Sequence, residues 1–284
     1  MNKLIHSFYG CKCSEHWMFL QSCYFCLSSI YANQSGFDID LYTNYDFGQL
    51  LDKAPYKNIY NIFENHKEYA KIDSKVWAWP KFVALDMVPR DTIHIDGDVF
   101  LKDNSCKELL DFDGCDVVLQ HLEHVNHFGD MKAIYDESYE SVKHLKWPDY
   151  IENKYLSHMP NNGVLGVNND SLWVRYRDTY WDMCNQCIPG MFDGNNITVP
   201  DIIFEQYFLK EMCDKFNYSI KYILPGEDWD DINEYAIEHK YQHVCCEKRK
   251  YLNKVISIIK RKDPICYESL KSNWGNKYPE YFEI

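Results

Sequence analysis

No stretch of about 20 consecutive apolar residues occurs in the 284-residue sequence, and its first residues carry no apolar segment followed by a small-residue cleavage site. The sequence therefore predicts neither a membrane span nor a secretory signal, and we expect a cytoplasmic protein. In that reducing compartment, the twelve cysteines are expected to be free thiols rather than a disulfide framework.

Positive charge is also scarce. The chain holds 30 Lys and Arg against 43 Asp and Glu, which gives a formal net charge of −13. A general nucleic-acid binder needs a basic field to attract phosphates, so this balance argues against that class. Internal repeats and low-complexity linkers are absent as well, and a single domain is the simplest organisation.

Two Cys-x-x-Cys pairs leave two interpretations open. Cys23/Cys26 and Cys184/Cys187 both fall in segments with helical spacing, where a spacing of three places both thiols on one side. A shared four-thiolate zinc site requires the two helices to touch. The alternative is that each cysteine is a small buried core residue, a role that cysteine often takes.

Short apolar segments alternate with helical periodicity along most of the chain. This alternation predicts a mainly parallel sheet covered by helices on both faces. The expected strands are residues 4–9, 39–43, 58–63, 116–120, 163–167 and 219–224, and a central strand is expected in the apolar run over residues 92–101, ending at Asp96 and Asp98. The expected helices are residues 15–33 with Ser14 as N-cap, a helix capped by Ser74 and ended by Pro89, and residues 171–184 and 201–214. Residues 121–160 lack strict periodicity and predict an insertion or lid over the sheet edge.

The most informative motif is Asp96-Gly97-Asp98, which directly follows a buried apolar strand and interrupts the centre of an apolar run from Thr92 to Leu101. Two carboxylates this close to a buried strand are costly unless a cation lies between them. In open α/β sheets, ligands bind in the crevice at the carboxyl ends of the strands. A divalent cation bridging these carboxylates to a diphosphate fits that position, whereas a solvated Asp-Gly turn is the structural alternative.

Ile95-Asp96-Gly97-Asp98-Val99-Phe100 resembles the DxD strand of nucleotide-sugar glycosyltransferases with the GT-A fold, particularly the bacterial family-8-like group. Further segments resemble that family in the same order along the chain, from the second strand to the end of the domain. They are Tyr42-Thr43, Lys81, Asn161-Asn162-Gly163, the segment from Asp201 to Gln206, and His243 with Lys248 and Arg249.

The resemblance implies a GT-A fold and a role for each of these residues. Asp96, Asp98 and His243 would hold Mn²⁺ or Mg²⁺. Asp201, Glu205 and Gln206 would lie near the reacting sugar as catalytic residues. The residues implied in binding the donor are Tyr42, Thr43, Lys81, Asp96, Gly97, Asp98, Asn161, Asn162, Gly163, Lys248 and Arg249.

The sequence departs from the family pattern at three places. Cys246 stands where the family has a Gly, and Arg249 is in register for the phosphate-binding Lys whereas Lys248 falls one position early. The first strand lacks the usual acidic residue near the nucleobase, so uracil is only a default.

The implied activity is transfer of a sugar from a nucleoside diphosphate sugar, a UDP-sugar by default, to a hydroxyl acceptor on a glycan or glycolipid. The resemblance favours retention of configuration. Two alternatives remain: a catalytically degenerate sugar-nucleotide binding protein, and a nucleotidyltransferase of related fold. The latter normally has a Gly-rich basic loop after the first strand, and residues 8–13 are poor in Gly.

The expected layout is one catalytic domain over residues 1–247 and a basic helical tail over residues 248–284. Within the domain, residues 1–120 form the nucleotide-binding half, 121–160 the insertion, and 161–247 the sugar and acceptor half. Residues 248–262 contain seven Lys or Arg, no acid, and a helical apolar stripe. This segment predicts either a peripheral contact with anionic lipid at the inner membrane face or a final helix packed on the sheet.

Overall fold

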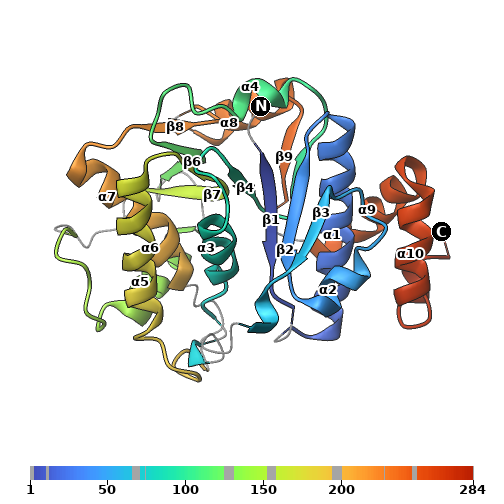
Figure 1. Ribbon diagram of the computed structural model, residues 1–284, viewed down its shortest axis with the longest axis horizontal. Coiled ribbons are helices and arrows are strands. Elements are labelled where there is room, and N and C mark those ends of the chain that lie inside the picture. Colours follow the sequence, from blue (N-terminus) through green and yellow to red (C-terminus); the bar gives the residue numbers. More distant parts are fainter. Residues whose placement is uncertain are drawn as a thin grey trace.

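The central element is a seven-stranded sheet with the order β3-β2-β1-β4-β7-β6-β8 (Figure 1). The computed structural model of the chain describes residues 3–10, 13–65, 71–73, 75–124, 131–151, 158–193, 200–226, 228–244 and 248–283. The strands of this sheet are β1 Leu4–Phe8, β2 Ile39–Thr43, β3 Asn58–Asn61, β4 Ile93–Ile95, β6 Val117–His124, β7 His158–Val167 and β8 Ile220–Tyr222.

Six of the seven strands run in the same direction. β1 is parallel to β2 and β4, β2 to β3, and β6 to β8. β7 alone is antiparallel, and it pairs with β4 on one side and β6 on the other. The carboxyl ends of the six parallel strands therefore meet at one edge, together with the amino end of β7. The prediction of an α/β fold with a mainly parallel sheet is confirmed.

Helices cover both faces of the sheet (Figure 1). One face carries α1 Glu15–Gln34, α2 Tyr45–Leu50, α9 Lys248–Lys262 and α10 Pro264–Trp274. The other carries α3 Trp79–Asp86, α5 Met131–Val142, α6 Asp170–Cys184 and α7 Phe208–Phe216. Two further helices, α4 Cys106–Leu109 and α8 Trp229–Glu238, lie near β5 Val99–Leu101 and β9 Tyr241–His243, which pair as a second, two-stranded sheet.

The apolar run from Thr92 to Leu101 is two strands rather than one. β4 belongs to the main sheet, whereas β5 leaves it and pairs with β9. The chain changes sheets across Asp96, Gly97 and Asp98, where the run is interrupted. The two aspartates thus directly follow a buried strand, as predicted, whereas the apolar period of the run does not reveal that its second half pairs with a different partner.

Two expected helices also differ. α3 begins at Trp79, with a proline at its start, so Val76 and Trp77 precede it; Ser74 lies outside the described residues. The predicted helix over residues 201–214 is a π-helix over Ile202–Tyr207 followed by α7. A π-helix shifts the hydrogen-bond pattern by one residue, and apolar spacing alone does not reveal it.

The segment over residues 121–160 is more regular than expected in its described parts. β6 continues to His124, α5 occupies Met131–Val142, and β7 begins at His158. The strands expected at 116–120 and 163–167 are thus each longer, because their polar ends pair with one another: His121 faces Asn161 and Glu123 faces Met159. Whether residues 121–160 act as a lid stays a prediction.

The basic segment forms α9, whose apolar stripe is buried against α1. The stripe consists of Leu252, Val255, Ile256 and Ile259. Because this stripe is already packed, a contact with lipid would depend on the exposed Lys and Arg side chains; the membrane contact stays a prediction. In the described part of the chain, no helix is both long and apolar enough to cross a bilayer.

The two Cys-x-x-Cys pairs lie in different cores. Cys23 and Cys26 pack with α9 and α10, whereas Cys184 and Cys187 pack with α3 and α7. All four are buried, and burial raises the pKa of Cys187 to about 12. Among the described residues they form no four-thiolate group, which leaves the core interpretation.

Truncation of the buried stripe tests the docking of α9. Leu252 is fully buried, so Leu252→Ala is expected to lower the free energy of unfolding by about 2–5 kcal/mol through lost burial and the cavity left behind. Lys254→Ala, an exposed change on the same helix, is expected to stay within about 0.5 kcal/mol. Urea unfolding of both variants measures the difference, and equal effects would contradict the packing.

Candidate metal centre

The turn between β4 and β5 fixes the positions of two carboxylates at the carboxyl edge of the sheet. The backbone N–H of Asp96 donates to the Gly163 carbonyl on β7 (2.8 Å), and the N–H of Val244 donates to the Asp98 carbonyl (3.0 Å). Gly97 lies between them against α1, where an added Cβ would overlap the ring of Phe25. Glycine is therefore required here for close packing, and the turn is clamped from both neighbouring strands.

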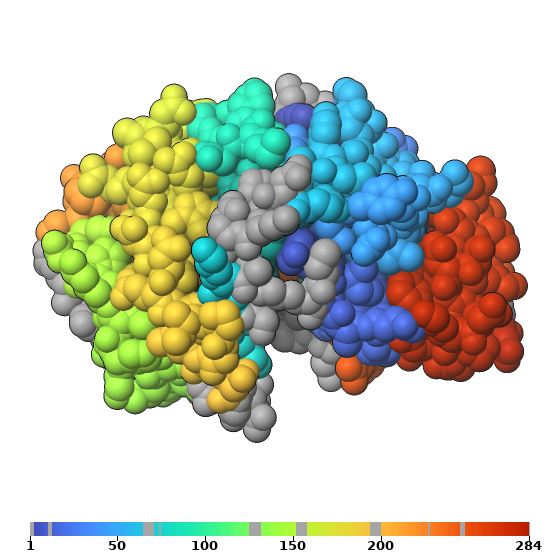
Figure 2. Space-filling view, turned by 60° about the horizontal axis from the view of Figure 1, so that its bottom comes forward, coloured from blue at the N-terminus to red at the C-terminus, as the bar shows by residue number. Residues whose placement is uncertain are grey.

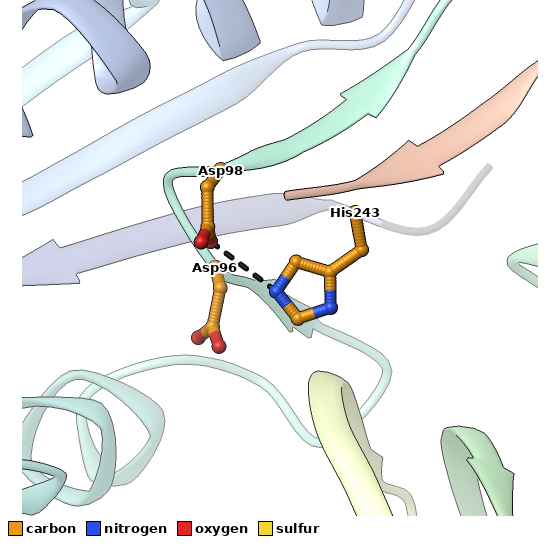
Figure 3. A group of neighbouring side chains, drawn as sticks. All are labelled: Asp96, Asp98 and His243. Carbon is orange, nitrogen blue, oxygen red and sulfur yellow. Dashed lines mark ion pairs between the residues drawn. The ribbon is translucent and has the colours of Figure 1, made fainter. Parts of the chain in front are cut away.

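The second sheet brings a histidine to these carboxylates. Val99 pairs with His243 across β5 and β9, and one ligand atom from each of Asp96, Asp98 and His243 lies within 4.8 Å of the others (Figure 3). His243 Nε2 is 3.3 Å from Asp98 Oδ1. Gly163 leaves the room for this imidazole, because a Cβ at that position would collide with its ring. The structure thus brings His243, from far along the sequence, to the two aspartates of the turn, and these three side chains form a candidate metal group.

The donor set fits a divalent cation. Two ligands at right angles and about 2.1 Å from one ion lie about 3 Å apart, which matches the separation of Asp98 Oδ1 and His243 Nε2. Two carboxylates with one imidazole suit Mn²⁺ or Mg²⁺ and leave coordination positions for water or phosphate oxygens. Figure 2 looks toward the carboxyl edge of the sheet, where the blue amino-terminal segments and the yellow segments lie on opposite sides.

A lysine faces Asp98, the more buried of the two aspartates. Lys248 Nζ is 2.7 Å from Asp98 Oδ2, whereas the neighbouring Arg249 is exposed. Burial acts to raise the pKa of Asp98, but Lys248 and His243 together hold that pKa well below the ordinary value of an aspartate. Of the two cations predicted for the phosphate contact, the structure places Lys248 at the metal group.

Lys81, which the sequence predicts to contact the donor phosphate, is buried among acceptors of the protein itself. Its side chain is buried, and its Nζ is within 3.1 Å of Asp96 Oδ1, 2.6 Å of Glu205 Oε1 and 3.0 Å of the Asn162 carbonyl oxygen. Burial acts to lower the pKa of Lys81, and the two carboxylates raise it above its ordinary value. With three acceptors around one ammonium, Lys81 positions Asp96 and Glu205.

Glu205 completes this buried group from the π-helix. Its side chain is fully buried, Oε1 accepts from Lys81, and Oε2 is buried with no hydrogen-bond partner among the described residues. Burial raises the pKa of Glu205 to about 7, with Lys81 acting in the opposite direction. The backbone carbonyl of Glu205 accepts from Tyr176 OH (2.7 Å) and from Asn162 Nδ2 (3.1 Å), so the π-helix is held in place from two sides.

Asp201 is engaged elsewhere. Its carboxylate accepts from the N–H groups of Trp77 and Ala78 ahead of α3 and from Tyr180 OH. Burial raises its pKa to about 6, against these hydrogen bonds. These hydrogen bonds hold the residues that lead into α3. None of the three involves Asp96, Asp98 or His243. Gln206 is half-buried beside Glu205.

The remaining predicted residues lie on the sheet around the centre. Tyr42 stacks on Tyr60 at 4.8 Å between ring centroids, and Thr43 Oγ1 donates to the Phe8 carbonyl. Asn161 is half-buried: its Nδ2 donates to Glu123 Oε1 (2.9 Å), and its Oδ1 accepts the Gly163 N–H (2.9 Å). Asn162 instead points into the protein and supports Glu205.

Sequence reasoning missed a polar network on β6. Glu123 accepts from Tyr135 OH and Asn161, and His121 Nε2 is 3.4 Å from Glu123 Oε1. Gln120 Nε2 and His121 Nδ1 are 3.1 Å apart. The signal was the alternation of His121 and Glu123, since residues two apart on a strand share a face. The predicted strand ends at residue 120, so both side chains fall outside it.

The chain belongs to a family described as one of unknown function (DUF6734), whose model matches residues 3–284. No curated protein matches the sequence. Among solved structures, the chain is similar to a galactosyltransferase, LgtC, in complex with donor and acceptor sugar analogues. That similarity has 9% sequence identity and a TM-score of 0.36, and it covers 78% of this chain and 72% of the other.

The buried ion group predicts strong coupling between Lys81 and Glu205. Lys81→Met leaves two carboxylates without their cation and is expected to cost about 3–5 kcal/mol of unfolding free energy. Combining it with Glu205→Gln removes one of the uncompensated charges. The double variant is therefore expected to lose at least about 1 kcal/mol less than the sum of the two single variants.

Urea unfolding without added metal measures this double-mutant cycle. Lys132→Met breaks an exposed ion pair with Asp136 on α5, and as a control it is expected to cost less than about 1 kcal/mol. Additive effects of Lys81→Met and Glu205→Gln would show that the two side chains do not interact as described.

Proposed function

We propose that this chain is a metal-dependent glycosyltransferase with a GT-A fold that transfers a sugar from a nucleoside diphosphate sugar to a hydroxyl acceptor. The observation that carries the proposal is the convergence of Asp96, Asp98 and His243 at the carboxyl edge of a mainly parallel sheet. Ligands of open α/β sheets bind at this edge. The order of the family-like segments along the sequence supports the same assignment.

The main electrostatic demand of the proposed reaction is the negative charge that accumulates on the departing diphosphate. The bond from the anomeric carbon to the diphosphate oxygen breaks, a bond from that carbon to the acceptor oxygen forms, and the acceptor proton passes to the departing diphosphate. A metal held by Asp96, Asp98 and His243 would supply positive charge to that leaving group. Lys248 is within reach of the same place and would add a second cation. We propose retention of configuration, following the family resemblance.

The buried residues act by positioning. Lys81 holds Asp96 against the end of β4 and ties it to Glu205, so the metal ligand stays in one orientation. We propose that the half-buried amides of Asn161 and Gln206 contact sugar hydroxyls. Asn161 is already oriented by Glu123 and by the Gly163 N–H.

The nucleotide is proposed to bind on the half formed by residues 1–120. β1, β2 and β3 end there side by side, and the stacked pair Tyr42 and Tyr60 braces β2 against β3. We propose that residues 161–247 bind the sugar and the acceptor, since β7, the π-helix and β9 supply Asn161, Gln206 and His243.

A thermal-shift panel of nucleoside diphosphate sugars, with and without Mn²⁺, tests this function. The cognate donor at a hundredfold excess over its Kd is expected to raise Tm by about 5 °C or more, and only with metal. Asp98→Ala removes a metal ligand and is expected to abolish the metal-dependent part of the shift. Asp182→Ala, an exposed change on α6, should leave it intact.

Product analysis separates the alternatives. Release of nucleoside diphosphate with the cognate donor is expected for a glycosyltransferase. Stabilisation without hydrolysis or transfer would instead identify a sugar-nucleotide binding protein, and formation of pyrophosphate from a nucleoside triphosphate and a sugar phosphate would identify a nucleotidyltransferase. The absence of any metal-dependent stabilisation across the panel would contradict the proposal.

A further inference from the structure

The Lys248 ammonium occupies one side of the metal group. It lies 2.7 Å from Asp98 Oδ2, while His243 faces the other oxygen at 3.3 Å. The Asp98 side chain is 6% exposed and the Lys248 side chain 17%. An anionic carboxylate this deeply buried needs a cation next to it, and Lys248 supplies that cation.

The lysine is held in place by α1. Its Nζ lies 5.6 Å from the ring centre of Trp17 and 5.9 Å from that of Tyr24, and aromatic faces attract ammonium groups at such distances. Tyr24 OH also donates to the Lys248 backbone carbonyl (2.8 Å), which fixes the start of α9 against α1. The ammonium position is therefore built by Trp17 and Tyr24 from one helix and Asp98 from the turn between β4 and β5, unlike a chance surface ion pair.

We propose that Lys248 is the resident counterion of Asp98, that a divalent cation has to displace it or bind beside it at a cost, and that the freed ammonium is taken up by the diphosphate of the donor. This inference rests on the proposed function, because it takes Asp96, Asp98 and His243 as the metal ligands. Two cations on one carboxylate repel each other, so metal binding and the Asp98–Lys248 ion pair oppose each other.

The same geometry couples metal binding to diphosphate binding. Metal alone breaks the Asp98–Lys248 pair without compensation and should bind weakly. A diphosphate gives the displaced ammonium a new anionic partner, so metal and diphosphate each strengthen the binding of the other by the same factor. Lys81 cannot act in this way, because it is buried and already shared between Asp96 and Glu205.

Electron paramagnetic resonance of free Mn²⁺ titrated into the full chain, with and without UDP, tests the inference. In Lys248→Met, the affinity for Mn²⁺ alone is expected to rise at least about fivefold, because the competing cation is gone. The factor by which UDP strengthens Mn²⁺ binding is expected to fall in the same variant. Lys248→Arg keeps a cation and should remain close to the unchanged protein in both respects.

A second variant keeps the inference testable if Lys248→Met does not fold. Trp17→Ala removes one aromatic wall from the ammonium while leaving Lys248 in place; Trp17 is 38% exposed, so the change is mild. It is also expected to raise the affinity for Mn²⁺ alone, by a smaller factor than Lys248→Met does. Lys254→Met, which removes an exposed cation from the same helix, is the matched control and should change neither quantity.

The outcomes distinguish the inference from the function on which it rests. Unchanged or weaker binding of Mn²⁺ alone in both Lys248→Met and Trp17→Ala, with normal binding in the unchanged protein, would overturn the counterion role and leave the proposed function standing. The absence of Mn²⁺ binding in every variant, with and without UDP, would overturn both.

Discussion

The neutralisation of buried carboxylates at the end of β4 is the constraint on which the rest of the site depends. Asp96 and Glu205 share the ammonium of Lys81, and Asp98 pairs with Lys248. The two lysines come from opposite faces of the sheet, Lys81 from α3 and Lys248 from the start of α9. The two aspartates are thus held by cations from two different helices, and the orientation of the metal group depends on both helices being docked.

The change of sheet between β4 and β5 gives this arrangement its shape. β4 ends in the main sheet, β5 pairs with β9, and the turn between them carries the acidic motif. Gly97 packs against Phe25 and Gly163 makes room for His243, so both glycines of the site are explained by close approach. The polar network around Glu123 extends the site along β6 and orients Asn161 beside it.

Much of the fold could be predicted from the sequence, because alternating apolar strands and amphipathic helices have distinct periods. The N-cap Ser14 and the helix it begins were both predicted, as was the strand over residues 39–43. Asp96 and Asp98 stood out because they interrupt an apolar run. The grouping of His243 with them came only from family resemblance, since β9 is three residues long and carries no pattern of its own. The burial of Lys81 had no sequence signal, because a lysine on an amphipathic helix ordinarily faces water.

The central claim is that Asp96, Asp98 and His243 hold a divalent cation at the edge of the sheet. Anomalous diffraction at the manganese edge, from crystals grown with Mn²⁺ and a nucleoside diphosphate, locates that ion directly. The account predicts one strong anomalous peak within coordination distance, about 2.0–2.4 Å, of oxygen atoms from both aspartates and a nitrogen of the histidine. Nucleotide density at the sheet edge without such a peak, or a peak held by other side chains, would contradict it.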